Sequence, residues 1–150
     1  MFEIKSGDLF GDKSDALVNA VNCQGSMDGG IARQFRIRFP EYFRDYADSC
    51  GRGEIRLGEV DLYEIGNSMP PFYIISFPTM FFPAAMARIE DIDSGLSDLR
   101  RKIENRRIRS IAMPALGCGV GGLEWAAVRK SIEAALSGMR GLHVSLYEPR

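Results

Sequence analysis

The stretch Ala16-Leu17-Val18-Asn19-Ala20-Val21 is an almost uninterrupted apolar run, and a glycine-rich loop, Gly25–Gly30, follows it. A short apolar run bounded by turn residues is typical of a strand that is buried on both faces of a sheet. After the loop, Ile31, Phe35 and Phe39 recur at helical spacing. The stretch therefore predicts a strand, a loop and a helix in succession, which is the repeating unit of α/β proteins.

The same alternation continues on both sides of this unit. Further strands are expected over Phe2–Lys5, Glu59–Ile65, Phe72–Phe77, Ser110–Leu116 and His143–Tyr147. Further helices are expected from Pro40 through Tyr46, along the apolar stripe from Ile89 to Ile103, and from Trp125 to Leu136. Strands that alternate with helices predict a largely parallel sheet with helices on both faces.

Length and composition indicate one globular domain, residues 1–150. The chain has 45% hydrophobic and 26% charged residues and a formal net charge of -1, so no long-range field favours nucleic acid or an anionic membrane. No apolar run approaches the roughly 20 residues that span a bilayer, and the first residues do not resemble a signal peptide. Three cysteines without a CxxC pair favour a reducing cytoplasm, and with a single histidine, His143, they suggest no metal site.

Two glycine-rich loops stand out, each between a predicted strand and a predicted helix. The first is Cys23–Gly30 and the second is Gly117-Cys118-Gly119-Val120-Gly121-Gly122. Glycine lets the backbone approach a ligand closely, and the beginning of a helix offers unpaired N–H groups to an anion. Because ligands bind at the carboxyl ends of strands in such sheets, the two loops could hold a diphosphate between them. A tight turn without a ligand is the simpler interpretation of either loop alone.

The second loop also matches the dinucleotide pattern GxGxxG. That pattern belongs on the first strand of its unit, with an acidic residue on a later strand. Here only one predicted strand, His143–Tyr147, remains after the loop and its helix. A P-loop is excluded as well because no Gly-Lys-Ser or Gly-Lys-Thr occurs, so neither nucleotide motif explains the loop.

The order of several short motifs resembles that of macrodomains over nearly the whole chain. They are Gly7-Asp8-Leu9, Val18–Asn22, Gly29-Gly30-Ile31-Ala32 and the Gly117–Gly122 loop. Phe77-Pro78-Thr79 and the block Pro114–Trp125 are most similar to the antitoxin-type macrodomains that remove ADP-ribose from DNA. The resemblance implies a three-layer α/β/α fold with a mixed, mostly parallel sheet of about six strands. It implies ADP-ribose, or an ADP-ribosylated DNA or protein, as partner, a cognate ADP-ribosyltransferase encoded nearby, and no cofactor.

The resemblance also assigns roles to individual residues. Asp8 would accept a hydrogen bond from the adenine amino group, and Leu9 would offer its backbone N–H to the base. Asn22 would bind the distal ribose, and Tyr147 would place its ring against adenine. The remaining residues of the implied ligand site are Gly29, Gly30, Ile31, Ala32, Pro78, Thr79, Leu116, Gly117, Cys118, Gly119, Val120, Gly121 and Gly122. From the residues alone, Asp8 fits an Asx turn, Asn22 a satisfied amide and Tyr147 a core aromatic equally well or better.

The expected catalytic lysine of the DNA-directed relatives is absent. Its position, directly after Phe-Pro-Thr, is Met80, and a thioether neither donates a proton nor carries charge. An aspartate that a protein-directed branch uses in the second loop matches Gly121. Lysine chemistry would therefore need Lys13 or another lysine to reach the site.

A second chemistry rests on Asp28. Met27–Ile31 resembles a segment of another macrodomain branch, in which an aspartate three residues before the apolar residue orients a water near the distal ribose. A diphosphate nearby would make such a carboxylate a better base. Asn22 and Asp28 are thus the candidate catalytic residues. The simpler alternative is that Asp28 is a solvated charge at the tip of the loop or a helix N-cap.

Three functions remain open on this basis: an ADP-ribosyl hydrolase, a module that binds ADP-ribose without cutting it, and a general binder of phosphate esters. The segment Met80–Met86 is unusually apolar for a loop and could cap the ribose, pack on the core or bind a partner. The arginines and lysine between Arg100 and Arg109 fit a solvated helix end better than a nucleic-acid contact.

Overall fold

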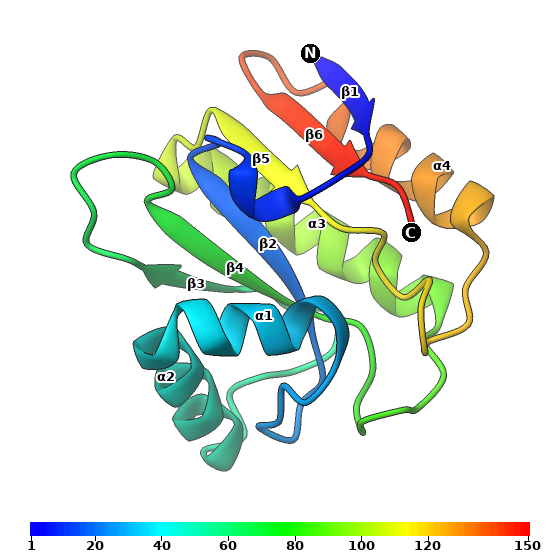
Figure 1. Ribbon diagram of the computed structural model, residues 1–150. Coiled ribbons are helices and arrows are strands. Elements are labelled where there is room, and N and C mark those ends of the chain that lie inside the picture. Colours follow the sequence, from blue (N-terminus) through cyan, green and yellow to red (C-terminus); the bar gives the residue numbers. More distant parts are fainter.

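Strands and helices alternate along the chain in the predicted order in the computed structural model, which describes residues 1–150 (Figure 1). The strands are β1 (Phe2–Lys5), β2 (Ala16–Val21), β3 (Asp61–Glu64), β4 (Tyr73–Pro78), β5 (Ser110–Met113) and β6 (His143–Tyr147). The helices are α1 (Gly30–Arg38), α2 (Pro40–Gly51), α3 (Ile89–Arg106), α4 (Trp125–Leu136) and a short 3-10 helix, Leu9–Gly11. No helix combines the length and the apolar character needed to cross a membrane.

The six strands form one sheet in the order β1-β6-β5-β2-β4-β3. All neighbouring pairs are parallel except β3 with β4, which are antiparallel. The predicted mixed, mostly parallel sheet is therefore confirmed. The N-terminal strand lies at one edge beside the C-terminal strand, and β2 lies inside the sheet between β4 and β5.

Helices cover both faces of the sheet, α1 and α2 on one side and α3 and α4 on the other (Figure 1). Successive residues of a strand point to opposite faces, and β2 shows the result. Ala16 and Val18 pack in the core under α3 and α4, whereas Leu17 and Val21 pack in the core under α1 and α2. Both faces of the strand are buried, which explains why its sequence is apolar without alternation.

Two strands are shorter than predicted. β5 ends at Met113 rather than Leu116, because Pro114 has no N–H to continue the ladder. β3 begins at Asp61 rather than Glu59, and the Val60 N–H donates instead to the buried Asp98 carboxylate at 2.8 Å.

The topology brings distant segments together at one end of the sheet, where the carboxyl ends of the parallel strands lie. β1, β2, β4, β5 and β6 all run in the same direction, so their carboxyl ends meet there. Both glycine-rich loops leave the sheet at this end, after β2 and after β5. This is the place where parallel sheets bind ligands.

Candidate functional site

A cleft of about 640 Å³ opens at the carboxyl ends of the five parallel strands. Its walls come from the segment after each strand: Gly7–Phe10, the loop from Asn22 to Ala32, Thr79–Ala84, Pro114–Gly121 and Tyr147–Arg150. The two glycine loops therefore share one cavity, as predicted.

The second glycine loop presents a row of free backbone donors to this cleft. Within the loop, the N–H of Cys118 donates to Ala115 O and that of Gly122 to Gly119 O. The N–H groups of Gly119, Val120 and Gly121 have no acceptor in the chain. Consecutive unpaired N–H groups form a concave site for anions.

The beginning of α1 supplies a second set of donors. The first helical N–H groups, those of Gly30, Ile31 and Ala32, have no acceptor, and all three residues line the cleft. The helix dipole adds a partial positive charge at this end. No lysine lines the cleft, and Arg150 is its one cationic residue. An anionic ligand would therefore be held mainly by backbone dipoles.

Asp8 and Leu9 lie at the end of the cleft near β1 and β6. Asp8 caps the 3-10 helix, with its Oδ1 accepting from the Phe10 N–H at 2.9 Å, so the Asx turn considered from the sequence is present. Its Oδ2 accepts no hydrogen bond, and the Leu9 N–H has no acceptor. One free carboxylate oxygen and one free N–H match the donor and acceptor of an adenine edge.

Tyr147 lines the same end of the cleft. Its hydroxyl donates to Asp12 Oδ2 at 2.8 Å, which fixes the position of the ring. Burial, together with this contact to a carboxylate, raises the pKa of Tyr147, so the hydroxyl stays protonated at neutral pH. The ring is half-buried, so it is neither a fully buried core aromatic nor a freely exposed ring.

Asn22 directly follows β2, and its side chain forms hydrogen bonds within the loop that it begins. Its amide nitrogen donates to Ser26 O and Oγ, both at 3.1 Å, and its Oδ1 accepts from the Gln24 N–H and the Tyr46 hydroxyl, both at 2.9 Å. These contacts hold the loop in shape. A ribose would have to share the amide with Ser26.

Asp28 also lines the cleft, but its carboxylate is 78% exposed. Its Oδ1 lies 2.9 Å from Nη1 of Arg36, eight residues later in α1. The N-cap of α1 is Gly29, so Asp28 does not cap the helix. As placed, the carboxylate forms a surface ion pair at the cleft rim.

The structure shows which residues occupy the positions where the resemblance implies a catalytic lysine and an aspartate. Met80 lines the cleft, while Lys13 is exposed and lies outside its lining. Gly121 is buried, and a Cβ there would come within 2.7 Å of Gly117 O and 2.9 Å of Ala87 Cβ. The loop in its present shape therefore has no room for an aspartate at position 121.

Three residues of the implied site are not part of the cleft lining. Pro78 is buried at the end of β4, and Leu116 is buried in the core under α3 and α4. Gly122 is exposed and lies outside the lining, where a Cβ would contact Met86 Cε at 3.7 Å. Conversely, the cleft includes positions that the sequence did not indicate, notably Phe10 and the segment Glu148–Arg150. Nothing in their local pattern could have found them, because only the pairing of β1 with β6 brings them to the site.

Neither a reactive thiol nor a metal site is evident at the cleft. Burial raises the pKa of Cys118, and its Sγ contacts Leu116 O at 3.6 Å. No three histidine, cysteine or acidic side chains come together closely enough to hold a metal ion.

Comparison with known proteins agrees with this architecture. Residues 18–132 match the model of the Macro domain family, and the chain belongs to this family. The macrodomain of Mycobacterium tuberculosis DarG has a similar structure, with a TM-score of 0.98 and 40% identity over 100% of this chain and 99% of that one.

Three further matches are to longer proteins. A protein of Thermus aquaticus named DNA ADP-ribosyl glycohydrolase is 40% identical over 149 residues, which are 99% of this chain and 41% of the relative. The solved structure of Thermosipho africanus DarTG in complex with ADP-ribose has a TM-score of 0.92 and 31% identity over 99% of this chain and 41% of that one. A Thermosipho africanus protein named DNA ADP-ribosyl transferase-DNA ADP-ribosyl glycohydrolase fusion protein is 32% identical over 81% of this chain and 35% of its own length. The chain thus spans about two fifths of the length of these curated relatives.

Proposed function

We propose that this domain binds ADP-ribose in the cleft at the carboxyl ends of the parallel strands. The observation that carries the proposal is the presence in one cleft of two rows of backbone N–H groups, Gly30–Ala32 and Gly119–Gly121, that have no acceptor in the chain. Two such rows suit a diphosphate, because each of its two phosphates offers oxygen acceptors. Asp8 and Leu9 then supply the complement of an adenine edge at one end of the same cleft.

The similarity to relatives that are solved with, or named for, ADP-ribose supports this choice of ligand over a general phosphate ester. Titration calorimetry with ADP-ribose, ADP and AMP tests it. We expect ADP-ribose to bind most tightly, and Asp8→Ala to weaken that binding. Equal affinity for the three nucleotides would leave only a general phosphate site, and the absence of any binding would refute the proposal.

The cleft lacks lysine chemistry, so we infer that binding without lysine-dependent cleavage is its basic activity. Met80 occupies the lysine position and no other lysine lines the cavity. A module of this kind would recognise ADP-ribosylated macromolecules and leave them intact. Rapid release of free ADP-ribose from an ADP-ribosylated DNA or protein by the purified domain would contradict this inference.

Hydrolysis that uses Asn22 and Asp28 is the second candidate. It is favoured by the position of both side chains on the cleft wall. Asp28 would have to leave Arg36 and orient a water toward the distal ribose. Release of free ADP-ribose that is abolished in Asp28→Asn, with ADP-ribose binding retained, would establish this mechanism. Turnover unchanged in Asp28→Asn would exclude it.

The relatives named for DNA ADP-ribosylation support modified DNA as the substrate class. The fusion of a transferase with a glycohydrolase in one relative supports a cognate ADP-ribosyltransferase as the source of the modification. A cytoplasmic location remains a prediction from the unpaired cysteines.

A further inference from the structure

A second cavity of about 570 Å³ lies next to the cleft, and a thin partition separates the two. The partition consists of two chain segments that alternate between the cavities. Asn22 and Ser26 face the cleft, whereas Cys23–Gly25 face the second cavity. In the same way Met80 and Pro83 face the cleft and Phe81 faces the second cavity. The Cys23 N–H donates to Phe81 O at 3.0 Å and joins the two segments.

The second cavity therefore adjoins the end of the cleft that Asn22 and Met80 line. This is the end opposite Asp8 and Tyr147. A ligand whose adenine lies near Asp8 would direct its distal ribose toward the partition. Any group attached to that ribose would pass over the partition toward the second cavity.

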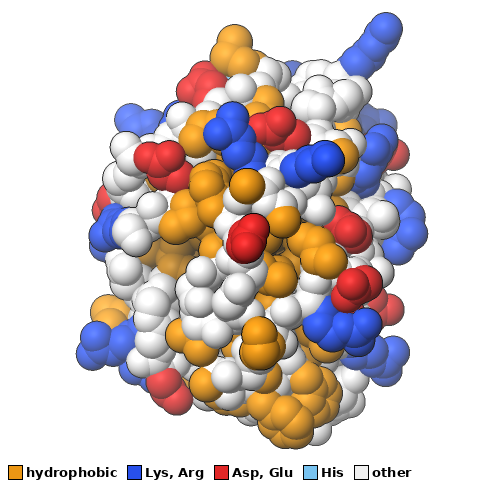
Figure 2. Space-filling view, turned by 90° about the vertical axis from the view of Figure 1, so that its right-hand side faces the viewer, with side chains coloured by type: hydrophobic (Ala, Val, Ile, Leu, Met, Phe, Trp, Pro, Cys, Tyr) orange, Lys and Arg blue, Asp and Glu red, His pale blue; other side chains and the backbone are white.

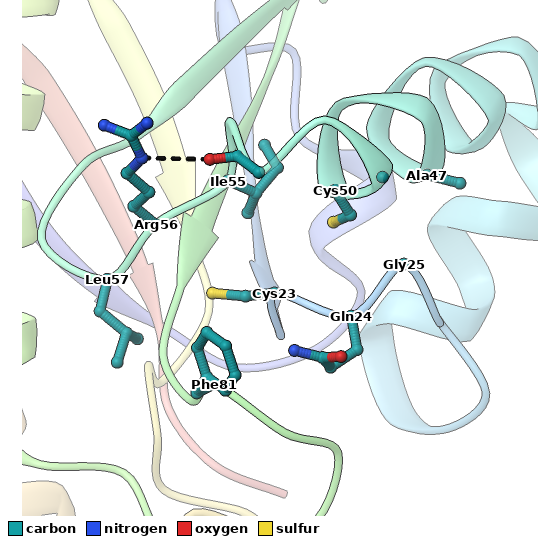
Figure 3. Close-up of a pocket in the computed structure, with 11 residues that line it drawn as sticks. Cys23, Gln24, Gly25, Ala47, Cys50, Ile55, Arg56, Leu57 and Phe81 are labelled. Atoms are coloured by element: carbon teal, nitrogen blue, oxygen red, sulfur yellow. Dashed lines mark hydrogen bonds between the residues drawn. The ribbon is translucent and has the colours of Figure 1, made fainter.

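The wall of the second cavity offers an apolar ring and an unengaged amide. The Phe81 side chain is 49% exposed, and Phe82 packs edge-on against it with ring centroids 4.7 Å apart. The side-chain amide of Gln24 makes no hydrogen bond within the chain and points toward Phe81 (Figure 3). Apolar side chains also project from the segment after β4 at the bottom of the face in Figure 2.

Neutral groups form the floor of this cavity. Cys23 is buried, and burial, the largest cause, raises the pKa of its thiol to about 11. Burial also raises the pKa of Cys50, which faces the same cavity. Both thiols are therefore uncharged at neutral pH.

One cation lies on the rim. Arg56 Nε donates to Gly53 O at 3.1 Å, which holds the side chain in place, and its guanidinium forms no ion pair (Figure 3). The neighbouring Arg52, by contrast, is paired with Glu54 at 3.0 Å. Arg56 is thus the guanidinium that remains free to meet a phosphate.

From this arrangement we propose that the second cavity binds a nucleobase of a single-stranded nucleic acid that carries the ADP-ribose in the cleft. The base would stack on Phe81 and meet Gln24 with its polar edge, and Arg56 would contact the adjoining phosphate. Stacking on an aromatic side chain with hydrogen bonds to the base edge is how single strands are recognised. An amide that both donates and accepts suits a base edge better than it suits an aliphatic group. This inference rests on the proposed binding of ADP-ribose.

The test compares two probes by titration calorimetry: unlabelled ADP-ribose, and a five-nucleotide single-stranded DNA that carries ADP-ribose on its central base. Both are measured on cold, freshly mixed samples. We expect the wild-type protein to bind the oligonucleotide at least about tenfold more tightly than ADP-ribose. Phe81→Ala should lose roughly tenfold for the oligonucleotide, as expected for one stacked base, and nothing for ADP-ribose.

Matched variants separate the cavity from the general surface. Phe82→Ala removes a neighbouring ring, 58% exposed, that does not line the cavity, and it should cost much less than Phe81→Ala. Arg56→Gln should weaken the oligonucleotide and reduce its salt dependence, whereas Arg52→Gln should not. Gln24→Ala should weaken the oligonucleotide alone.

Each other outcome overturns the proposal in a recognisable way. Normal ADP-ribose binding without extra affinity for the oligonucleotide would overturn this inference and leave the proposed function intact. Equal effects of Phe81→Ala and Phe82→Ala, or equal gains from an ADP-ribosylated peptide, would exclude a nucleobase site. Loss of binding to both probes in the wild-type protein would overturn the proposed function and this inference together.

Discussion

Replacing Gly121 by alanine should reshape the second glycine loop. The φ angle of Gly121 is outside the left-handed region, so alanine has no backbone penalty there, and the effect must be steric. Its Cβ would come within 2.7 Å of Gly117 O and 2.9 Å of Ala87 Cβ. Neither atom can move alone, because Gly117 O accepts from Leu123 N and Ala87 N donates to Gly121 O, both at 2.9 Å.

The expected cost follows from these contacts. Adding one methyl group to a packed region destabilises a protein by about 1–3 kcal/mol. In a domain of this size each kcal/mol lowers Tm by about 2–4 °C, so the midpoint should fall by about 2–12 °C. If the loop shift also removes one N–H donor from a bound phosphate, the loss of about 1.5–3 kcal/mol corresponds to about 10- to 150-fold in ADP-ribose affinity.

Gly119→Ala is the matched control in the same loop. Gly119 is exposed, also has no positive φ, and a Cβ there meets nothing within 4 Å. Thermal unfolding followed by circular dichroism should show little change for this variant and a clear loss for Gly121→Ala, and calorimetric titration then compares their ADP-ribose affinities. Equal midpoints for the two variants would refute the argument from packing.

Three further predictions concern other parts of the fold. Gly95→Ala should destabilise the protein by about 1–3 kcal/mol in denaturant titrations, because the new Cβ would lie 2.5 Å from Cζ of the buried Phe77; a stability equal to wild type would show that the ring moves freely. Asp8→Asn should keep the cap on the Phe10 N–H yet weaken ADP-ribose binding in calorimetry, since the free Oδ2 acceptor is replaced by an amide NH2 that cannot accept from the adenine amino group; unchanged affinity would remove Asp8 from the ligand site. Burial alone would raise the pKa of Asp98, but hydrogen bonds from Lys102, the Val60 N–H and Arg101 hold it below the ordinary value of an aspartate. A lowered folded-state pKa means that this stabilisation is present above the unfolded-state pKa, roughly 3.9, and is lost as pH falls below it through the folded-state value. Asp98→Asn should therefore be less stable at pH 7 and show a flatter loss of stability below about pH 4; parallel acid-unfolding curves would contradict this assignment.

The pattern of apolar residues was sufficient to predict the order of strands and helices along the chain. The run Ala16–Val21 predicted a strand buried on both faces, and the stripe from Ile89 to Ile103 predicted a helix with one apolar face; both are confirmed. Differences arose at strand ends, where a single residue decides the pairing. Pro114 ends β5, and Asp98 takes the Val60 N–H away from β3.

The sequence alone determined the two glycine loops and the motifs that carry the family resemblance, because these depend on residue type and local order. It also indicated that lysine chemistry is missing, since Met80 is visible without a structure. Motif order could not distinguish residues that face the cleft from those behind it. Pro78 and Leu116 stand beside cleft residues in the chain but are buried.

Only the tertiary structure decided which distant segments share a cavity. The parallel pairing of β1 with β6 brings Asp8 and Tyr147 to one end of the cleft, and the bond from Cys23 N–H to Phe81 O creates the partition at the other. These contacts join residues far apart in sequence, so no local pattern encodes them. The position of Asp28, drawn toward Arg36, and the internal hydrogen bonds of Asn22 are likewise products of packing and charge in three dimensions.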